Sequence, residues 1–162
     1  MKKVLLLLFA IIGLGFAASA QNNAIGVRIG GGQGYYGAEI SYQRNLGGIH
    51  RLEADLGYRR CDYYGFSSWT LVGVYQLHFD IPAVQNFGWY FGPGARFDLL
   101  TWSEYKRVYY SAIFGVTGQV GMDYHFSAIP LQLSLDFRPC FYLIPHTAFQ
   151  WGDFALGIRY RF

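Results

Sequence analysis

The sequence predicts an all-β fold, an eight-stranded antiparallel transmembrane up-and-down β-barrel that follows a cleaved signal peptide. After residue 20, apolar and polar residues alternate with a period of two through most of the chain. Aromatic residues make up 20% of the 162 residues and charged residues only 14%, which excludes a disordered chain. The length corresponds to a single domain.

The first 20 residues have the pattern of a signal peptide. Lys2 and Lys3 precede an uncharged apolar run, residues 4–18, and Ala18-Ser19-Ala20 is a small-x-small cleavage site. The alternative, a transmembrane helix, needs about 20 apolar residues. We therefore expect residues 1–20 to be the signal peptide and residues 21–162 to be the outer-membrane barrel domain. Without the two leader lysines, 13 − 2 = 11 basic residues face 10 acidic ones, so a nucleic-acid partner is not indicated.

The first half of the expected barrel contains four alternating segments. Residues 25–30 set aliphatic side chains against glycine and arginine, and residues 36–43 set tyrosine, alanine and isoleucine against polar residues. Residues 51–59 alternate apolar with charged or glycine residues throughout. Residues 69–79 place aromatic and aliphatic side chains on one face, although two valines fall on the opposite, polar face.

The second half contains four more. Residues 89–99 alternate around Pro93, which lacks a backbone donor and therefore predicts a bulge or a bend. Residues 114–126, 131–138 and 153–162 each set apolar residues against glycine and polar residues, and the chain stops on an aromatic residue. Together these segments predict eight strands.

The length of the chain supports this number of strands. Eight strands of about 10 residues, the length that crosses a bilayer at a tilt, use about 80 residues. Ten strands would leave connections under about 5 residues each, which disagrees with the loops expected at residues 60–68 and 100–110. Closing the sheet also removes its edges.

The alternation alone permits two barrels, a soluble one with apolar residues inside, as in lipocalins, or a membrane barrel with apolar residues outside. An eight-stranded barrel has an interior just wide enough for side chains, and the apolar face carries too many Trp, Phe, Tyr and Leu residues to fit there. The polar face is rich in glycine, which suits a crowded lumen. The sequence therefore predicts a membrane barrel.

Outward aromatic residues near the segment ends predict two interfacial girdles. The turns at residues 45–48, 80–82 and 127–130 fall on the end where both termini lie. We expect this end to be periplasmic, with the longer loops outside the cell.

The C-terminal run resembles an assembly signal. The alternating residues 157–162 include Tyr160 and end on Phe162, as in clients of the barrel-assembly machinery. With the signal peptide and the alternating segments, residues 21–162 resemble the small Gram-negative outer-membrane β-barrel proteins, of the OmpX and OmpA barrel kind. Residues 89–94 and 129–139 resemble Bacteroidetes barrels of unassigned role. This resemblance implies a cell outer-membrane location and an architecture that many functions share.

Charged residues gather on the face expected to line the lumen. Buried charges need partners, and an Arg side chain can bridge two carboxylates. The expected ion network, which fills and rigidifies the barrel, comprises Arg28, Glu39, Arg51, Glu53, Asp55, Arg59, Arg96, Asp98, Asp123, Asp136, Arg138 and Arg159, with Asp153 and Arg161 beside them. The alternative use of these residues is a narrow path for protons or small solutes.

A hydrolytic site is the second candidate function. His125 and Ser127 have a spacing seen in outer-membrane lipid A deacylases, where a His activates a Ser nucleophile, and Asp123 or Asp136 would orient the His. The expected topology instead places His125 in the lumen near the periplasmic turn, so we expect it to belong to the ion network and expect no enzyme activity. The four histidines are scattered, so no metal or other cofactor site is predicted.

The expected outer loops carry candidate binding residues. They are Tyr63, Tyr64, Trp102, Tyr105, Lys106 and Arg107. Aromatic side chains beside basic ones suit protein, glycan or lipopolysaccharide ligands, or else they continue the outer girdle. Cys61 and Cys140 lie on opposite sides of the expected ring, so a disulfide would form only if the loops fold inward. We expect a monomeric protein with a structural or surface-interaction role in adhesion or membrane integrity, with a lipid hydrolase second and a narrow channel third.

Overall fold

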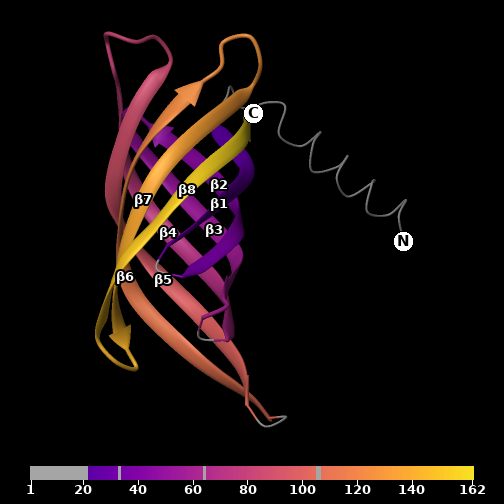
Figure 1. Ribbon diagram of the computed structural model, residues 1–162. Coiled ribbons are helices and arrows are strands. Elements are labelled where there is room, and N and C mark those ends of the chain that lie inside the picture. Colours follow the sequence, from indigo (N-terminus) through magenta and orange to yellow (C-terminus); the bar gives the residue numbers. More distant parts are fainter. Residues whose placement is uncertain (1–21, 33, 64, 105–106) are drawn as a thin grey trace.

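A computed structural model describes residues 22–32, 34–63, 65–104 and 107–162 (Figure 1). The predicted signal peptide lies outside these residues. Among the described residues, no helix has the length and apolarity needed to cross a membrane.

Eight antiparallel strands close into a barrel in sequence order, as predicted. Each strand pairs with the next along the chain, and β8 pairs with β1, so no sheet edge is left open among the described strands. The strands are β1 (Asn23–Gly32), β2 (Tyr35–Gly47), β3 (His50–Cys61), β4 (Phe66–Asp80), β5 (Phe87–Glu104), β6 (Arg107–His125), β7 (Leu131–Ile144) and β8 (Ala148–Arg161).

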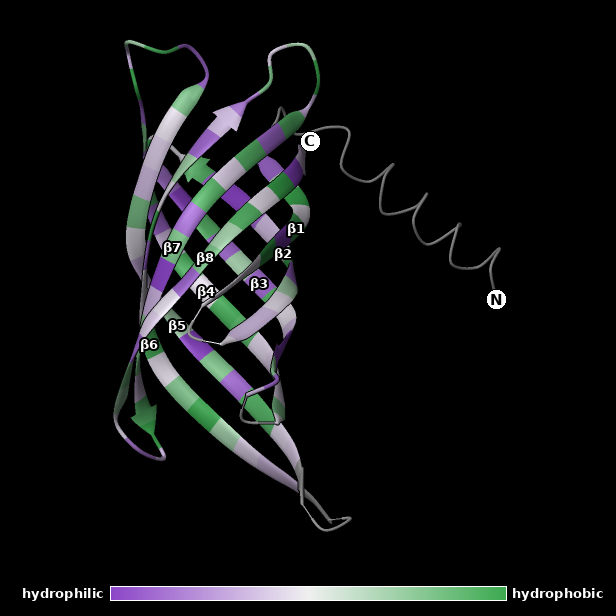
Figure 2. Ribbon diagram, viewed as in Figure 1, coloured by the Kyte–Doolittle hydropathy of each residue, from purple (hydrophilic) through white to green (hydrophobic). Residues whose placement is uncertain are grey.

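The outer surface of the barrel is apolar and its interior is polar. Hydrophobic and hydrophilic residues alternate along the strands (Figure 2). Leu56 and Leu156 remain 50% and 65% exposed, whereas Glu53 and Arg159 are buried. Val72 and Val74, the two exceptions in the pattern of β4, are buried in the lumen among the polar residues. The predicted inside-out arrangement is thus the one that the structure has.

Outward aromatic rings lie near both ends of the barrel. Toward the end with the termini, Phe79 and Trp89 stack with their centroids 5.1 Å apart. Toward the other end, Tyr58 and Trp69 make an edge contact at 5.5 Å. The two groups occupy the positions expected for interfacial girdles.

The connections differ from those predicted. Residues 60–68 and 100–110 are mostly strand, because β3 continues to Cys61 and the β5–β6 hairpin continues to Glu104 and Arg107. The expected long loops at this end are therefore wrong, and a hairpin that projects beyond the other strands takes their place (Figure 1). Trp102 stacks on Tyr109 across this hairpin, a cross-strand pair that favours strand over loop.

Of the bulge or bend expected at Pro93, the bulge is not found in the described β4–β5 ladder. This ladder is interrupted between the pairs Val74–Gly94 and Leu77–Phe91, but the register is the same on both sides. The register shifts lie elsewhere, for example between Asn45 and Gly47. The missing donor removes a ladder bond without adding a residue to the strand.

The two ends of the described chain meet at one rim of the barrel. Asn23 donates its backbone N–H to Phe162 at 3.0 Å, and Phe162 donates back to Asn23 at 2.9 Å. The connections at residues 48–49, 81–86 and 126–130 lie at this same rim, as predicted. We call it the terminal rim, and the opposite one the distal rim.

Cys61 and Cys140 are both buried and both free thiols. They belong to β3 and β7, which are not neighbours in the ring. Because the barrel wall shields both thiols, reagents should reach them only when the barrel opens.

We expect neither thiol to react with a maleimide while the barrel is folded in detergent, and both to react after unfolding without reductant. The two side chains are 2% and 1% exposed, so labelling requires opening of the barrel. Mass spectrometry of the intact chain counts the labels. An unfolded chain that takes up no label would show that the two cysteines are bonded.

Candidate functional site

The centre of the lumen is built around Arg28 of β1. Its guanidinium donates to Asp136 at 3.0 Å and to Glu39 at 3.0 Å. It also donates to Asp153 at 3.2 Å, and all four side chains are almost fully buried. One cation thus connects β1 with β2, β7 and β8.

A second buried arginine, Arg138 of β7, reaches across the barrel to β3. It donates to Asp55 at 2.6 Å, to Glu53 at 2.7 Å and to Glu39 at 3.3 Å. Arg159 of β8 lies beside it and donates to the hydroxyls of Ser41 and Ser134. Uncharged donors and acceptors that the sequence analysis did not single out complete this layer, namely Gln43, Gln76, Gln119 and Gln132.

Glycine makes room for these long side chains. A Cβ atom at Gly57 would lie 2.3 Å from Cγ of Glu39, and one at Gly157 would lie 2.4 Å from Oγ of Ser134. Both separations are shorter than real Cβ contacts. The glycine-rich polar face is therefore a requirement of a lumen filled by long side chains.

Near the distal rim the network encloses a cavity of about 130 Å³. Arg96 donates to Asp98 at 2.8 Å, and Tyr142 donates to the same carboxylate at 3.0 Å. Further polar side chains line it, and its apolar walls are Phe66, Leu100 and Ile113. The lumen is thus less tightly filled at this end than at its centre.

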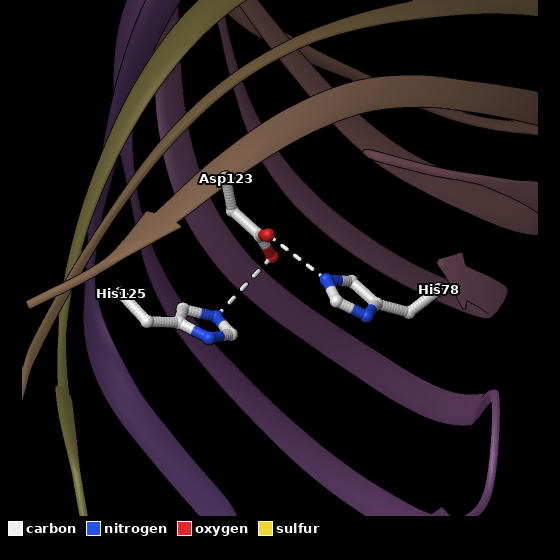
Figure 3. A group of neighbouring side chains, drawn as sticks. All are labelled: His78, Asp123 and His125. Atoms are coloured by element: carbon white, nitrogen blue, oxygen red, sulfur yellow. Dashed lines mark hydrogen bonds and ion pairs between the residues drawn. The ribbon is translucent and has the colours of Figure 1, made fainter. Parts of the chain in front are cut away.

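At the terminal rim, His78, Asp123 and His125 form a cluster (Figure 3). The Asp123 carboxylate lies between the two imidazoles, with Oδ1 2.9 Å from Nε2 of His78 and Oδ2 3.6 Å from Nε2 of His125. The two rings stack at 5.8 Å with their planes 11° apart. Arg51 and Gln132 donate to Asp123 Oδ2 at 2.8 and 2.9 Å.

This cluster is not predicted from the sequence, and the expectation of four scattered histidines is wrong for His78 and His125. His78 and His125 are far apart in sequence, on β4 and β6, and β5 separates these strands. The available signal was that both lie on inward faces near the same rim. Only the strand register brings the two histidines together, because it places Gly88 of β5 opposite both Asp80 of β4 and Asp123 of β6.

The residues of the hydrolase hypothesis are not assembled into a triad. Ser127 Oγ accepts a hydrogen bond from Asn86 at 2.8 Å, and Asp136 binds Arg28 in the centre of the lumen. His125 lies 3.6 Å from Asp123, one of the two carboxylates expected to orient it, so it is the Ser127 part of the hypothesis that is not met. This geometry lacks the Ser–His hydrogen bond that activates a nucleophile.

The candidate binding residues of the distal rim are only partly described. Tyr63 is exposed in the β3–β4 turn and Trp102 lies in β5. Tyr64, Tyr105 and Lys106 lie outside the described residues, and Arg107 is the first residue of β6. Beside Tyr63, Asp62 accepts hydrogen bonds from Tyr36 at 3.0 Å and from Arg60 at 2.7 Å, which hold the pKa of its carboxyl below the ordinary value.

The comparisons with known proteins identify the architecture. No family model matches the chain, and a search of curated protein sequences finds no match. Among solved structures, the N-terminal β-barrel domain of Pseudomonas aeruginosa OprF is similar with a TM-score of 0.68 and 16% identity, over 88% of this chain and 98% of that one. Neisserial surface protein A (NspA) is similar with a TM-score of 0.64 and 14% identity, over 86% and 95%.

A major outer membrane protein from Thermus thermophilus is also similar, with a TM-score of 0.52 and 16% identity, over 86% of this chain and 99% of that one. All three neighbours are outer-membrane barrels. The fold of this chain is therefore that of the small outer-membrane β-barrels, as the sequence resemblance implies.

Proposed function

We propose that this protein is a monomeric outer-membrane barrel that acts through its stability and its exposed distal rim, in membrane integrity or adhesion, and not through its lumen. The observation that carries the proposal is the filled centre of the barrel. Arg28 and Arg138 are each bound to three carboxylates there, and these ion pairs across the centre of the lumen are evidence against an open channel.

The proposed orientation places the terminal rim in the periplasm. A chain exported through a signal peptide at residues 1–20 reaches the outer membrane from that side, and the run ending in Tyr160 and Phe162 is the proposed signal to the barrel-assembly machinery. The distal rim then faces outward, with Tyr63 and Tyr110 exposed to lipopolysaccharide, proteins or glycans.

Two measurements test the proposal. We expect planar bilayers containing the folded protein to show no single-channel steps, because the central ion pairs block the lumen. We also expect the mass spectrum of lipid A to be the same in outer membranes with and without the protein, because His125, Ser127 and Asp136 are not assembled.

Either positive result would overturn the proposal. Discrete conductance steps would establish the narrow channel. The loss of an acyl chain from lipid A would establish the hydrolase, and substitution of Ser127 by Ala would then show whether this residue is the nucleophile.

A further inference from the structure

We propose that His78, Asp123 and His125 form a binding site for a divalent transition-metal ion, with zinc as the ion that fits best. A tetrahedral zinc ion holds neighbouring nitrogen and oxygen ligands about 3.3 Å apart. Nε2 of His78 lies 2.9 Å from Oδ1 of Asp123, and Nε2 of His125 lies 3.6 Å from Oδ2 of the same carboxylate, so each imidazole is near this spacing from one of the two Asp123 oxygens. All three ligand atoms lie within 4.8 Å of one another, so only a small closure of the imidazoles is needed.

One ligand atom is already available. Nε2 of His125 is buried and has no hydrogen-bond partner among the described residues. Its side chain is nevertheless 22% exposed, and it lines two cavities at the terminal rim. An unpaired imidazole nitrogen beside a carboxylate, with access from the aqueous side, is what a metal site requires.

The groups around the cluster orient its ligands. Nδ1 of His78 lies 4.0 Å from Oδ1 of the exposed Asp80, which is an ion-pair distance and too long for a hydrogen bond, so the negative charge favours a ring proton on Nδ1, the tautomer that presents Nε2 to a metal. Arg51 and Gln132 fix the carboxylate of Asp123 through Oδ2. Such outer partners commonly orient histidine and carboxylate ligands in metal sites.

Gly88 of β5 provides the space through which β4 and β6 meet. A Cβ atom at this position would lie 2.5 Å from Nε2 of His78 and 2.9 Å from Oδ1 of Asp123. Any larger residue on the strand between them would push the two ligands apart. A bound ion would therefore connect β4 to β6 across β5 at the terminal rim.

The ligand types select among metals. Calcium and magnesium prefer sites made of oxygen atoms, whereas two imidazoles and one carboxylate suit zinc and its neighbours in the first transition row. The guanidinium of Arg51 repels a bound metal ion. The carboxylates of Asp80 and Asp123 together offset this repulsion. Three protein ligands leave a fourth position, which a water molecule from the rim can fill.

Zinc titration of the full chain tests the site. The protein is produced without a histidine tag, folded in detergent, stripped with a chelator and titrated with Zn²⁺ in competition with a chromophoric indicator. We expect one ion per chain. We expect H78A and H125A each to weaken binding by about tenfold or more, since each removes a ligand.

Matched controls separate this site from incidental binding. H146A removes a histidine in the β7–β8 connection at the distal rim and should leave the affinity unchanged. G88A keeps all three ligands but should weaken binding, whereas G73A, where a Cβ would meet nothing within 4 Å, should not. Circular dichroism confirms that each variant remains a barrel.

Three outcomes would overturn the proposal. One is the lack of stoichiometric zinc binding by the folded chain. The second is an affinity that H78A and H125A leave unchanged. The third is an equal loss of affinity in H146A, which would show that surface histidines bind the ion.

Discussion

Replacing Arg138 by Met should lower the free energy of unfolding by about 3–5 kcal/mol, the cost of removing one partner from a buried ion pair. Arg138 is fully buried and binds Glu39, Glu53 and Asp55. Its loss leaves Asp55 without its cation in a space that solvent does not reach. Denaturant titration of the protein in lipid vesicles, followed by tryptophan fluorescence, measures the change.

Arg60 provides the matched control for this prediction. It pairs with Asp62 at 2.7 Å, but both side chains are at least 60% exposed. An exposed pair contributes about 0–1 kcal/mol, so Arg60→Met should have little effect. Equal effects of the two substitutions would mean that water reaches the carboxylates around Arg138, which would favour a hydrated path through the lumen.

The two faces of the barrel are predictable from the sequence because alternation is a local property. A residue such as Glu39 or Leu56 faces inward or outward according to its position in the strand alone. The prediction succeeds even at Val72 and Val74, which the pattern places on the polar face and the structure places in the lumen.

The partners of the inward residues cannot be predicted in the same way. Arg28 and Asp136 are 108 residues apart and meet because the barrel closes with a particular stagger between strands. The same holds for His78 and Asp123, whose contact depends on the register of both β4 and β6 with β5. The alternation of residues along a single strand carries no information about this stagger between strands.

The loops expected at the distal rim are wrong for a different physical reason. Residues 100–110 have no clean alternation, so the sequence predicts a binding loop there. In a two-stranded hairpin that projects from the barrel, neither face is packed against a core, and the alternation that marks a buried strand is not required. The stacked pair of Trp102 and Tyr109 adds a side-chain contact to the backbone pairing of this hairpin.

Placing an arginine at Leu56 should destabilise the folded barrel by about 2–4 kcal/mol in a phospholipid bilayer, the range for an arginine that faces lipid near the midplane. Leu56 lies in the middle of β3 with its side chain pointing outward, 50% exposed. In a soluble barrel such an exposed position would accept a charge at little cost. The prediction therefore depends on lipid, and not water, covering this surface.

Val84 separates the effect of lipid from that of exposure. It is 51% exposed, like Leu56, but it lies in the β4–β5 connection at the terminal rim. Val84→Arg should change the free energy of unfolding by about 0–1 kcal/mol, as at the membrane interface. If Leu56→Arg has an equally small effect in the same vesicles, the apolar outer surface does not face hydrocarbon. The exposed aliphatic belt would then have to be covered by protein instead.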